Sequence, residues 1–303
     1  MNRHSINRTF GNNENTLGLS LAIPSVVIVS GFLIFPFFYS LVLSFFSKDL
    51  ARPDTNAFIG LINYINLFKD AYFLNSLKVT AIFSFVSVFF ELVIGVGIAL
   101  ILNMKFKGRG FVRGLIILPW ALPNIVNASM WAWIYNANYG ALNALFSQLG
   151  FIKDYQIWLG HANSSMVLVI LANVWKETPF TVIMVLAALQ AIPKQMYDAA
   201  VIDGAGIIQK GYYITLAYIK QILMVCGLLQ LIWSILHTFE IIYVITRGGP
   251  ANATDILPLR IYWQTFKSLR FGYGASMSYF IGILIFIPAF FYIRSAYKSS
   301  VEF

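Results

Sequence analysis

The sequence has few charged residues for its length. Only 11% of its 303 residues are Asp, Glu, Lys or Arg, whereas 59% are hydrophobic and 17% are aromatic. Soluble globular domains carry about 25% charged residues, so this composition excludes an ordinary soluble fold. Apolar runs of 20 or more uncharged residues recur along the chain, and such runs are long enough to cross a bilayer as helices. The composition therefore predicts an all-α, polytopic membrane protein.

Cysteine and histidine are also scarce. Cys226 is the single cysteine and lies in an apolar run, which excludes an intrachain disulfide and a cysteine metal cluster. The three histidines, His4, His161 and His237, are far apart in the sequence. The sequence also lacks the H-E-x-x-H motif of zinc proteases, the G-x-S-x-G motif of serine hydrolases and the P-loop of ATPases. We therefore expect neither an enzyme nor a cofactor or metal site in this chain.

The net charge of +9 at neutral pH does not point to nucleic acid. The basic residues are scattered over short segments between apolar runs, as expected where they set membrane topology and meet lipid headgroups.

Six apolar segments predict six transmembrane helices, at residues 15–47, 79–104, 115–135, 164–191, 221–246 and 275–293. The first run is far longer than the core of a signal peptide, which indicates a retained span. Prolines at positions 24, 36, 119 and 123 predict bends. We expect a single membrane domain over residues 1–303, with a polar tail at 1–16 and core spans over about 77–295.

A polar island at residues 193–217 interrupts the apolar runs. It reads PKQMYDAAVIDGAGIIQKGYYITLA, and its four charged side chains cannot lie inside a bilayer. Pro193 is placed to begin a helix, and Gly204 is placed to end or bend it. The small apolar surface of Ala199, Ala200 and Val201 suits a groove on another protein. The alternative is an ordinary connecting loop.

The island resembles the EAA loop of ATP-driven, binding-protein-dependent importers, whose pattern is Y-E-A-A-x-x-D-G-A followed, after about nine residues, by I-T-L-P. Asp198 replaces the usual Glu, and Ala217 replaces the usual Pro. The matching residues are Tyr197, Ala199, Ala200, Asp203, Gly204, Ala205, Ile214, Thr215 and Leu216.

A second segment, TRGGPANATDILPLRIYWQTF from Thr246, resembles the T-x-G-G-P-x-x-x-T-x-x-L-P segment of sugar-type importer permeases. Residues 58–64 (FIGLINY) are similar to an outer-loop element of the same family, and residues 175–180 (WKETPF) to an element of its fourth span. The resemblance runs from about residue 20 to 295 and points to the MalF- and UgpA-like permease subunits of type I carbohydrate importers.

This resemblance implies one half of a sugar translocation path, with six spans in the MetI-like permease fold. It implies a second, related permease, two ATPase subunits that use ATP and Mg, and an extracellular or periplasmic solute-binding protein. It also implies that the island docks on the ATPase, through Tyr197, Asp198, Ala199, Ala200, Asp203, Gly204 and Ala205. The expected location is the bacterial cytoplasmic membrane with both termini in the cytoplasm. Charge alone favours this orientation by a thin margin, because eleven basic residues fall on the inside and nine on the outside.

Polar residues within the spans are candidates for the substrate path, because such groups face protein or water. On the fifth span, one helical face carries Gln230, Ser234 and His237, with Thr238 and Glu240 beside it. On the third span, Asn124 and Asn127 offer amides to hydroxyls, and Trp131 offers an aromatic face to a sugar ring. The alternative is that these groups join packed helices. Glu91 and the pair Lys176 and Glu177 also stay open between structural and functional roles.

Two other functions compete with the importer permease. A secondary transporter or channel would predict charged relays in several spans and inverted repeats, and neither is present in the sequence. Within the importers, glycerol phosphate is the rival cargo, but it would require cations in the path. Lys176 is the only basic residue deep within a span, which favours a neutral glycan.

Overall fold

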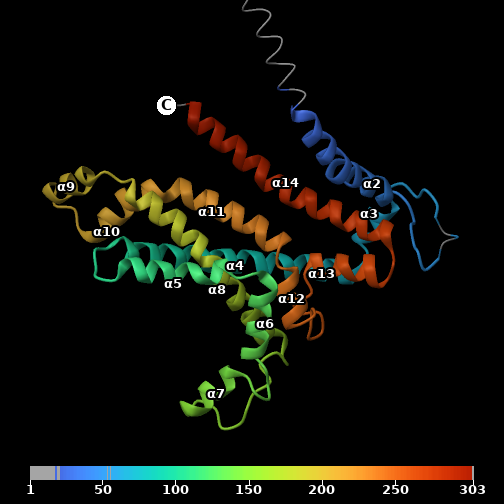
Figure 1. Ribbon diagram of the computed structural model, residues 1–303, viewed down its shortest axis with the longest axis horizontal. Helices are drawn as coiled ribbons and strands as arrows, with labels where there is room; N and C mark the ends of the chain where they lie inside the picture. The colour runs from blue at the N-terminus through green and yellow to red at the C-terminus, as the bar shows by residue number, and fades with distance from the viewer. Residues whose placement is uncertain (1–17, 19–20, 53, 55, 302–303) are drawn as a thin grey trace, which may run out of the picture. The chain divides into compact units, whose positions relative to one another are not determined.

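The structure is a computed structural model that describes Gly18, residues 21–52, Asp54 and residues 56–301 (Figure 1). The predicted tail at 1–16 lies outside these residues. Within them the chain is helical and has no strands, only two isolated β-bridges, Phe46–Phe58 and Asp49–Arg270. This confirms the all-α class. The chain divides into two compact units, Met1–Asn66 with Gln264–Tyr279, and Leu67–Trp263 with Phe280–Phe303.

The first unit contains a 24-residue apolar helix, Leu21–Ser44, which includes a π-helical segment η1 (Ser30–Ile34) and α2 (Phe35–Ser44). The next α-helix along the chain is α3 (Ile62–Leu67). The Asn63 side chain donates to the carbonyls of Ser44 and Phe46 at 2.8 and 2.9 Å, and the Ser44 hydroxyl lies 2.7 Å from that of Tyr64. Asn63 and Tyr64, the last two residues of the FIGLINY segment, therefore hold the chain in place where it leaves α2.

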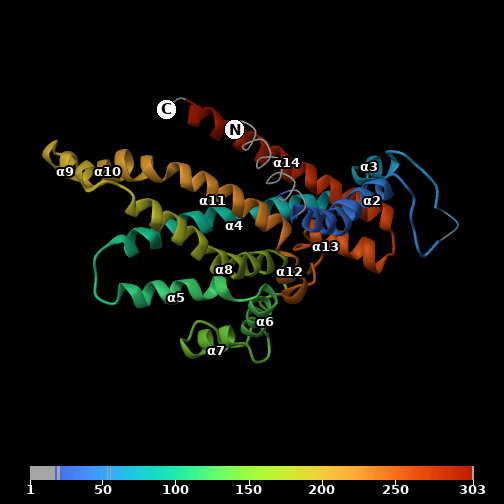
Figure 2. The same cartoon turned by 45° about the horizontal axis from the view of Figure 1, so that its top comes forward.

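The second unit is built on α4 (Ala71–Asn103), α8 (Ala162–Gln190) and α11 (Ala217–Leu236), which lie side by side (Figures 1 and 2). Asp70 caps α4 by accepting the N–H groups of Tyr72 and Phe73, at 2.9 and 3.3 Å. Helices α4 and α8 lie close together at Gly95, since a Cβ there would lie 2.6 Å from the Thr181 side chain. Glycine at this position lets the two backbones meet.

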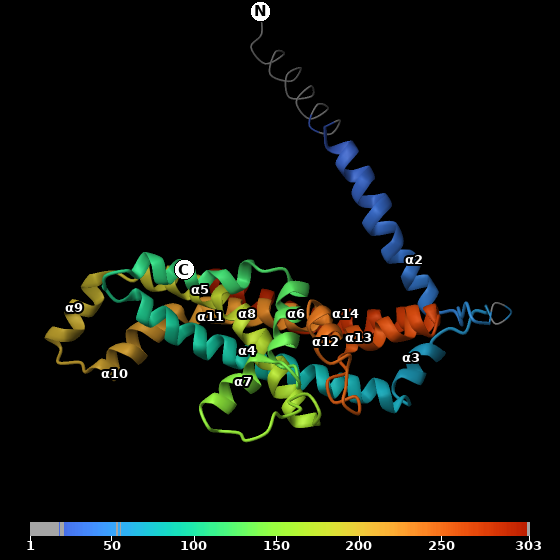
Figure 3. The ribbon, with the colours of Figure 1, turned by 60° about the horizontal axis from the view of Figure 1, so that its bottom comes forward.

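The remaining helices of this unit are short. They are α5 (Arg109–Ala121), α6 (Asn124–Ile134), α7 (Ala141–Gln148), α9 (Lys194–Ile202), α10 (Ile207–Lys210), α12 (Phe239–Ile245) and α13 (Leu257–Tyr262), with the π-helical segment η3 (Gly211–Leu216). A second π-helical segment, η4 (Trp263–Lys267), crosses the boundary into the first unit after Trp263. The last helix, α14 (Phe271–Val301), spans the boundary between the units. The turn between α4 and α5 and the α9–α10 segment lie at the same end of the α4–α8–α11 bundle (Figures 1 and 3).

Among the described residues, four helices are long and apolar enough to cross a membrane: Leu21–Ser44, Ala71–Asn103, Ala162–Gln190 and Ile207–Leu236. The predicted third span is a helix pair, α5 and α6, bent by 96° between Ala121 and Asn124. The prolines at 119 and 123 explain this break, because proline lacks the N–H group that a continuous helix needs. The apolar part of α14, Phe271–Ile287, is shorter than the other four. The count of six spans therefore holds only approximately.

The fifth span differs from its predicted limits. It was expected as one segment at 221–246, but the helix begins at Ile207, inside the polar island, and stops at Leu236. His237 and Thr238 separate it from α12. The early start has a physical reason, since residues 211–219 carry no charge and no proline that would end the helix.

Candidate functional site

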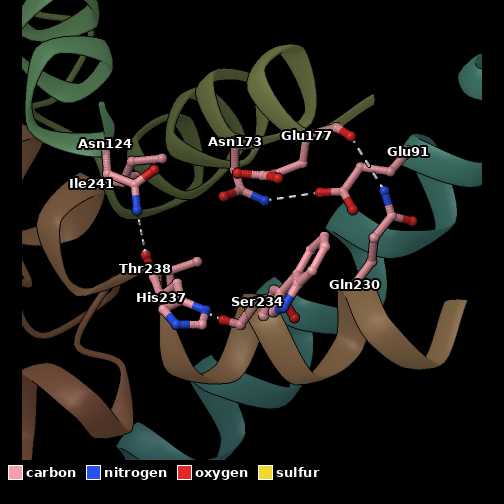
Figure 4. A pocket seen from close by; sticks show the side chains of 10 residues that line it. Glu91, Asn124, Asn173, Glu177, Gln230, Ser234, His237, Thr238 and Ile241 are labelled. Carbon is pink, nitrogen blue, oxygen red and sulfur yellow. Dashed lines mark hydrogen bonds between the residues drawn. The ribbon is translucent and has the colours of Figure 1, made fainter. Parts of the chain in front are cut away.

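The second unit contains a small polar cavity between α4, α8, α11 and the beginnings of α6 and α12 (Figure 4). Its volume is about 20 Å³, room for roughly one water-sized group. Its lining consists of Glu91, Asn124, Asn173, Glu177, Gln230, Trp233, Ser234, His237, Thr238 and Ile241. All of these side chains except Trp233 and Ile241 are polar or charged, which is unusual within an apolar bundle.

The break between α11 and α12 brings several of these groups to the cavity. The Thr238 hydroxyl donates to the Ser234 carbonyl at 2.8 Å, and the Ser234 hydroxyl donates to the Leu231 carbonyl at 2.9 Å. The helix stops at His237, whose carbonyl accepts from the Asn124 side chain at 3.4 Å. Interrupted helices free backbone groups at membrane depth, which is tolerated where they line a cavity or meet protein.

Two carboxylates lie on the opposite wall. Glu91 on α4 is 1% exposed and accepts a 2.9 Å hydrogen bond from the Asn173 side chain on α8. Glu177, one turn further along α8, forms an ion pair with Lys176 at 3.1 Å. The Gln230 side chain reaches from α11 to donate to the Glu177 carbonyl at 3.4 Å. These contacts tie α4, α8 and α11 together around the cavity.

Five of the eight predicted path residues line this cavity: Asn124, Gln230, Ser234, His237 and Thr238. The other three lie elsewhere. Asn127 is buried in α6, and Trp131 packs against Trp175 and Tyr135 at ring distances of 5.7 and 5.2 Å. Glu240 is half-buried in the first turn of α12, where a helix favours negative charge.

Sequence reasoning did not assign four of the cavity's polar or aromatic residues to a path: Glu91, Asn173, Glu177 and Trp233. The signal for Glu91 and Glu177 was their charge within apolar spans. Asn173 and Trp233 gave no comparable signal, because only the packing of α8 against α4 and α11 brings them to the cavity.

The polar island forms a helix, a turn and a second helix. Helix α9 is preceded by Pro193, as predicted, and Gly204 follows it with φ of +75°, a conformation that favours glycine. The hydroxyls of Tyr197 and Thr215 lie 3.0 Å apart and join the two sides of the turn. Tyr197 and Ala200 pack on a buried cluster that includes Ala99, Leu189 and Ile219. The island is thus attached to α4, α8 and α11.

Beyond that attachment, the island presents apolar side chains outward. Ile202, Ile207 and Ile208 are each at least 86% exposed, and Val201 is 59% exposed. Asp198 and Ala199 are exposed on the same short helix. Exposed aliphatic side chains gathered on α9 and at the start of the following helix are typical of a protein-binding surface.

The profile of the family described as "Binding-protein-dependent transport system inner membrane component" matches residues 91–300, which is more than half of the chain. The chain belongs to this family. It is 37% identical to the trehalose/maltose transport system permease protein MalF of Thermococcus litoralis over 281 residues, which cover 93% of this chain and 94% of that protein. It is 32% identical to the sulfoquinovosyl glycerol transport system permease protein SmoG of Agrobacterium fabrum, covering 88% and 85% of the two chains.

A third relative is the sn-glycerol-3-phosphate transport system permease protein UgpA of Yersinia pestis, with 31% identity and 88% coverage of both chains. Among solved structures, the chain resembles a bacterial ABC transporter involved in the import of the acidic polysaccharide alginate. The TM-score is 0.83 with 23% identity, covering 96% of this chain and 99% of that one. The match confirms the importer permease fold. The permease is an inner membrane component, and its relatives are transport subunits rather than enzymes.

Proposed function

We propose that this permease forms one half of the translocation path of an ATP-driven sugar importer, with the polar cavity as part of that path. The observation that carries the proposal is the cavity itself. In a family of transport permeases, it places the predicted fifth-span residues at a broken helix, among groups able to exchange hydrogen bonds with hydroxyls. MalF of Thermococcus litoralis, a trehalose/maltose system permease, supports a sugar as the cargo.

The cavity is too small to enclose a sugar, so it would receive a single hydroxyl while the rest of the cargo lies outside it. His237 is exposed, and a neutral imidazole both donates and accepts hydrogen bonds. Trp233 adds an aromatic surface and packs on Phe180 with ring centroids 4.8 Å apart. A second, related permease would supply the facing half of the path.

Coupling to an ATPase would use the island. The attachment of Tyr197 and Ala200 to the buried cluster gives a rigid route from α9 to α4, α8 and α11. The exposed isoleucines would fill an apolar groove on the ATPase, and the path would need two such docking points for two ATPase subunits, which use ATP and Mg. We place the island in the cytoplasm, because the basic turn at 105–113 lies at the same end of the bundle. For both termini, a cytoplasmic location is proposed from the family resemblance alone.

The test is uptake by proteoliposomes that contain this chain, its second permease, the ATPase and the binding protein. We expect ATP-dependent uptake of radiolabelled trehalose or maltose. Uptake of glycerol phosphate instead of either sugar would favour the rival cargo suggested by the UgpA relative. If no sugar moves while the complex hydrolyses ATP in response to its binding protein, the proposed sugar cargo is wrong.

A further inference from the structure

The charged side chains that line the cavity are two carboxylates, Glu91 and Glu177. The ammonium of Lys176 is held by Glu177 at 3.1 Å. Lys176 is buried and does not itself line the cavity. Among the described lining residues, His237 is the only one that can become a cation. With Glu91 ionised the set carries one net negative charge, and with Glu91 protonated it is neutral, so neither state offers an unpaired lysine or arginine to an anion.

Three lining side chains offer acceptor oxygens to a cargo. Ser234 and Thr238 each donate their single hydroxyl proton to a backbone carbonyl, which leaves their oxygens as acceptors. Gln230 is 1% exposed, and its Oε1 atom has no hydrogen-bond partner among the described residues. An unpaired buried acceptor is costly, and a ligand that donates a proton to it removes that cost. These oxygens therefore favour a cargo with hydroxyl or ammonium donors, while His237 and Trp233 can donate to its oxygens.

From the charge and the acceptors together, we infer that the path of this permease selects neutral, hydroxyl-rich sugars or amino sugars and rejects sugars that carry phosphate, sulfonate or carboxylate groups. Glu91 and Glu177 are the specificity-determining residues. This inference rests on the proposed function, because it names the cargo class of the same cavity. An anion meets carboxylates and acceptor oxygens in this cavity and finds no unpaired cation among the described lining residues. Where Glu91 is ionised, Coulomb repulsion adds to this: two like unit charges about 10 Å apart, at an effective dielectric constant near 20, change occupancy about tenfold or more.

A charge probe tests the cavity without any cargo. In the assembled importer, His237→Cys in a Cys226→Ala background provides one thiol at the cavity, and Tyr139→Cys provides an exposed reference thiol outside it. The rates of modification by a trimethylammonium and by a sulfonate methanethiosulfonate reagent are measured on both thiols. We expect the cation-to-anion rate ratio at position 237, normalised to position 139, to exceed one, by up to about tenfold where Glu91 is ionised.

Neutralising the carboxylates should reduce that ratio. Glu91→Gln and Glu177→Gln should each lower it several-fold, and the double variant should bring it to one or below, since Lys176 then lacks its partner. Asp154→Asn, on the exposed loop after α7, is the matched control and should not change it. A normalised ratio near one in the parent protein, or no change in either glutamine variant, overturns the inference. No labelling at position 237 in any nucleotide state overturns it too.

Uptake assays in the same importer keep the two proposals apart. If the wild-type importer moves no sugar, the proposed function fails, whatever the labelling ratio. If it moves neutral sugars, glucuronate-containing disaccharides and sugar phosphates should enter at least about tenfold more slowly. The glutamine variants should reduce that difference in uptake rate. Because the binding protein is the same in all of them, any such change arises in the permease. Equal uptake of neutral and anionic sugars by the wild type overturns the inference and leaves the proposed function standing.

Discussion

Asp255 shows how single side chains hold the segment that follows the fifth span. Its carboxylate is 2% exposed, forms an ion pair with Arg260 and accepts a hydrogen bond from Ser76 at 3.0 Å. The Thr254 hydroxyl donates to the Gly249 carbonyl at 2.8 Å and lies 2.7 Å from that of Thr246. The spacing of the T-x-G-G-P-x-x-x-T segment is therefore that of a closed turn, which the Asp255–Ser76 hydrogen bond joins to the start of α4.

The pKa of Asp255 gives a pH-dependent prediction for Arg260→Gln. Burial raises the pKa of Asp255, and Arg260 and Ser76 lower it less than burial raises it. A raised pKa in the folded state contributes stability that is present below the unfolded value, about 3.9, and is lost as pH rises through the folded value. At pH values above the folded-state pKa, the buried carboxylate is charged, and its stability in the folded protein depends on pairing with Arg260.

We therefore expect Arg260→Gln to lower the free energy of unfolding by about 3 kcal/mol at neutral pH, since it leaves a buried charge unpaired. The loss should shrink as the pH falls through the raised folded-state pKa of Asp255, because the protonated carboxyl is neutral and no longer needs a cation. Thermal unfolding of the purified complex between pH 4 and 8 measures it. Arg247→Gln, an exposed arginine of the same segment, is the control. An equal loss at every pH would contradict the pairing.

His237→Ala separates a sugar-binding role from a packing role. One hydrogen bond to a neutral partner contributes about 0.5–1.5 kcal/mol, so uptake per folded complex should fall by about 2- to 13-fold. Because the His237 side chain is exposed, the yield of complex with the ATPase should not change. Uptake and yield are measured on the same preparation. An unchanged rate with a reduced yield would assign His237 to packing between helices.

At the scale of helices, the close approach of α4 and α8 predicts the effect of adding one methyl group. A Cβ at Gly95 would lie 2.6 Å from Thr181, which is fully buried, so the helices must separate. Gly95→Ala should reduce the free energy of unfolding by about 1–3 kcal/mol. Gly97→Ala, two residues along the same helix, meets nothing within 4 Å and should be neutral or stabilising. Thermal unfolding of both variants gives the comparison, and similar results for the two would refute close packing here.

The island's turn gives a second prediction at this scale. Gly204 has φ of +75° and donates its N–H to the Val201 carbonyl at 3.1 Å. Proline fixes φ near −65° and has no N–H, so Gly204→Pro must rearrange the turn between α9 and α10. We expect the variant to insert into membranes, but to lose sugar uptake and stimulated ATP hydrolysis. Gly211→Ala, with φ of −59° and open space around it, is the control. Normal uptake and hydrolysis in Gly204→Pro would rule out coupling through this turn.

Much of the element order could be predicted from the sequence, because long apolar runs and prolines mark spans and breaks directly. The 96° bend and the start of α9 at Pro193 follow from local chemistry of this kind. The extension of the fifth span back to Ile207 could not be predicted in this way, because the uncharged aromatic residues after Lys210 suit a helix as well as a loop. The partner of Glu91 is 82 residues away, and no periodicity in the sequence shows that α4 and α8 bring the two together.

At the scale of the whole molecule, the cavity and the island each indicate that this chain is one half of a larger assembly. The cavity holds about one water-sized group, whereas a sugar path needs a facing wall. The island is one docking segment with exposed isoleucines, and a pair of ATPase domains needs two. The chain also lacks a P-loop. We therefore expect that the chain alone cannot transport, and that a second permease, the ATPase and the binding protein are each required.

A subunit-omission series measures this requirement. Proteoliposomes with all components should accumulate labelled sugar with ATP, and omission of any one should reduce uptake to the level of protein-free vesicles. Affinity purification of the tagged chain from its native membrane should recover a second permease and the ATPase in a ratio of one to two. If the second permease is another copy of this chain, two differently tagged copies will purify together and uptake will need no other permease. Clear ATP-dependent uptake by the chain without an ATPase would refute the division of labour, because the energy would then have to enter through a site that this sequence does not contain.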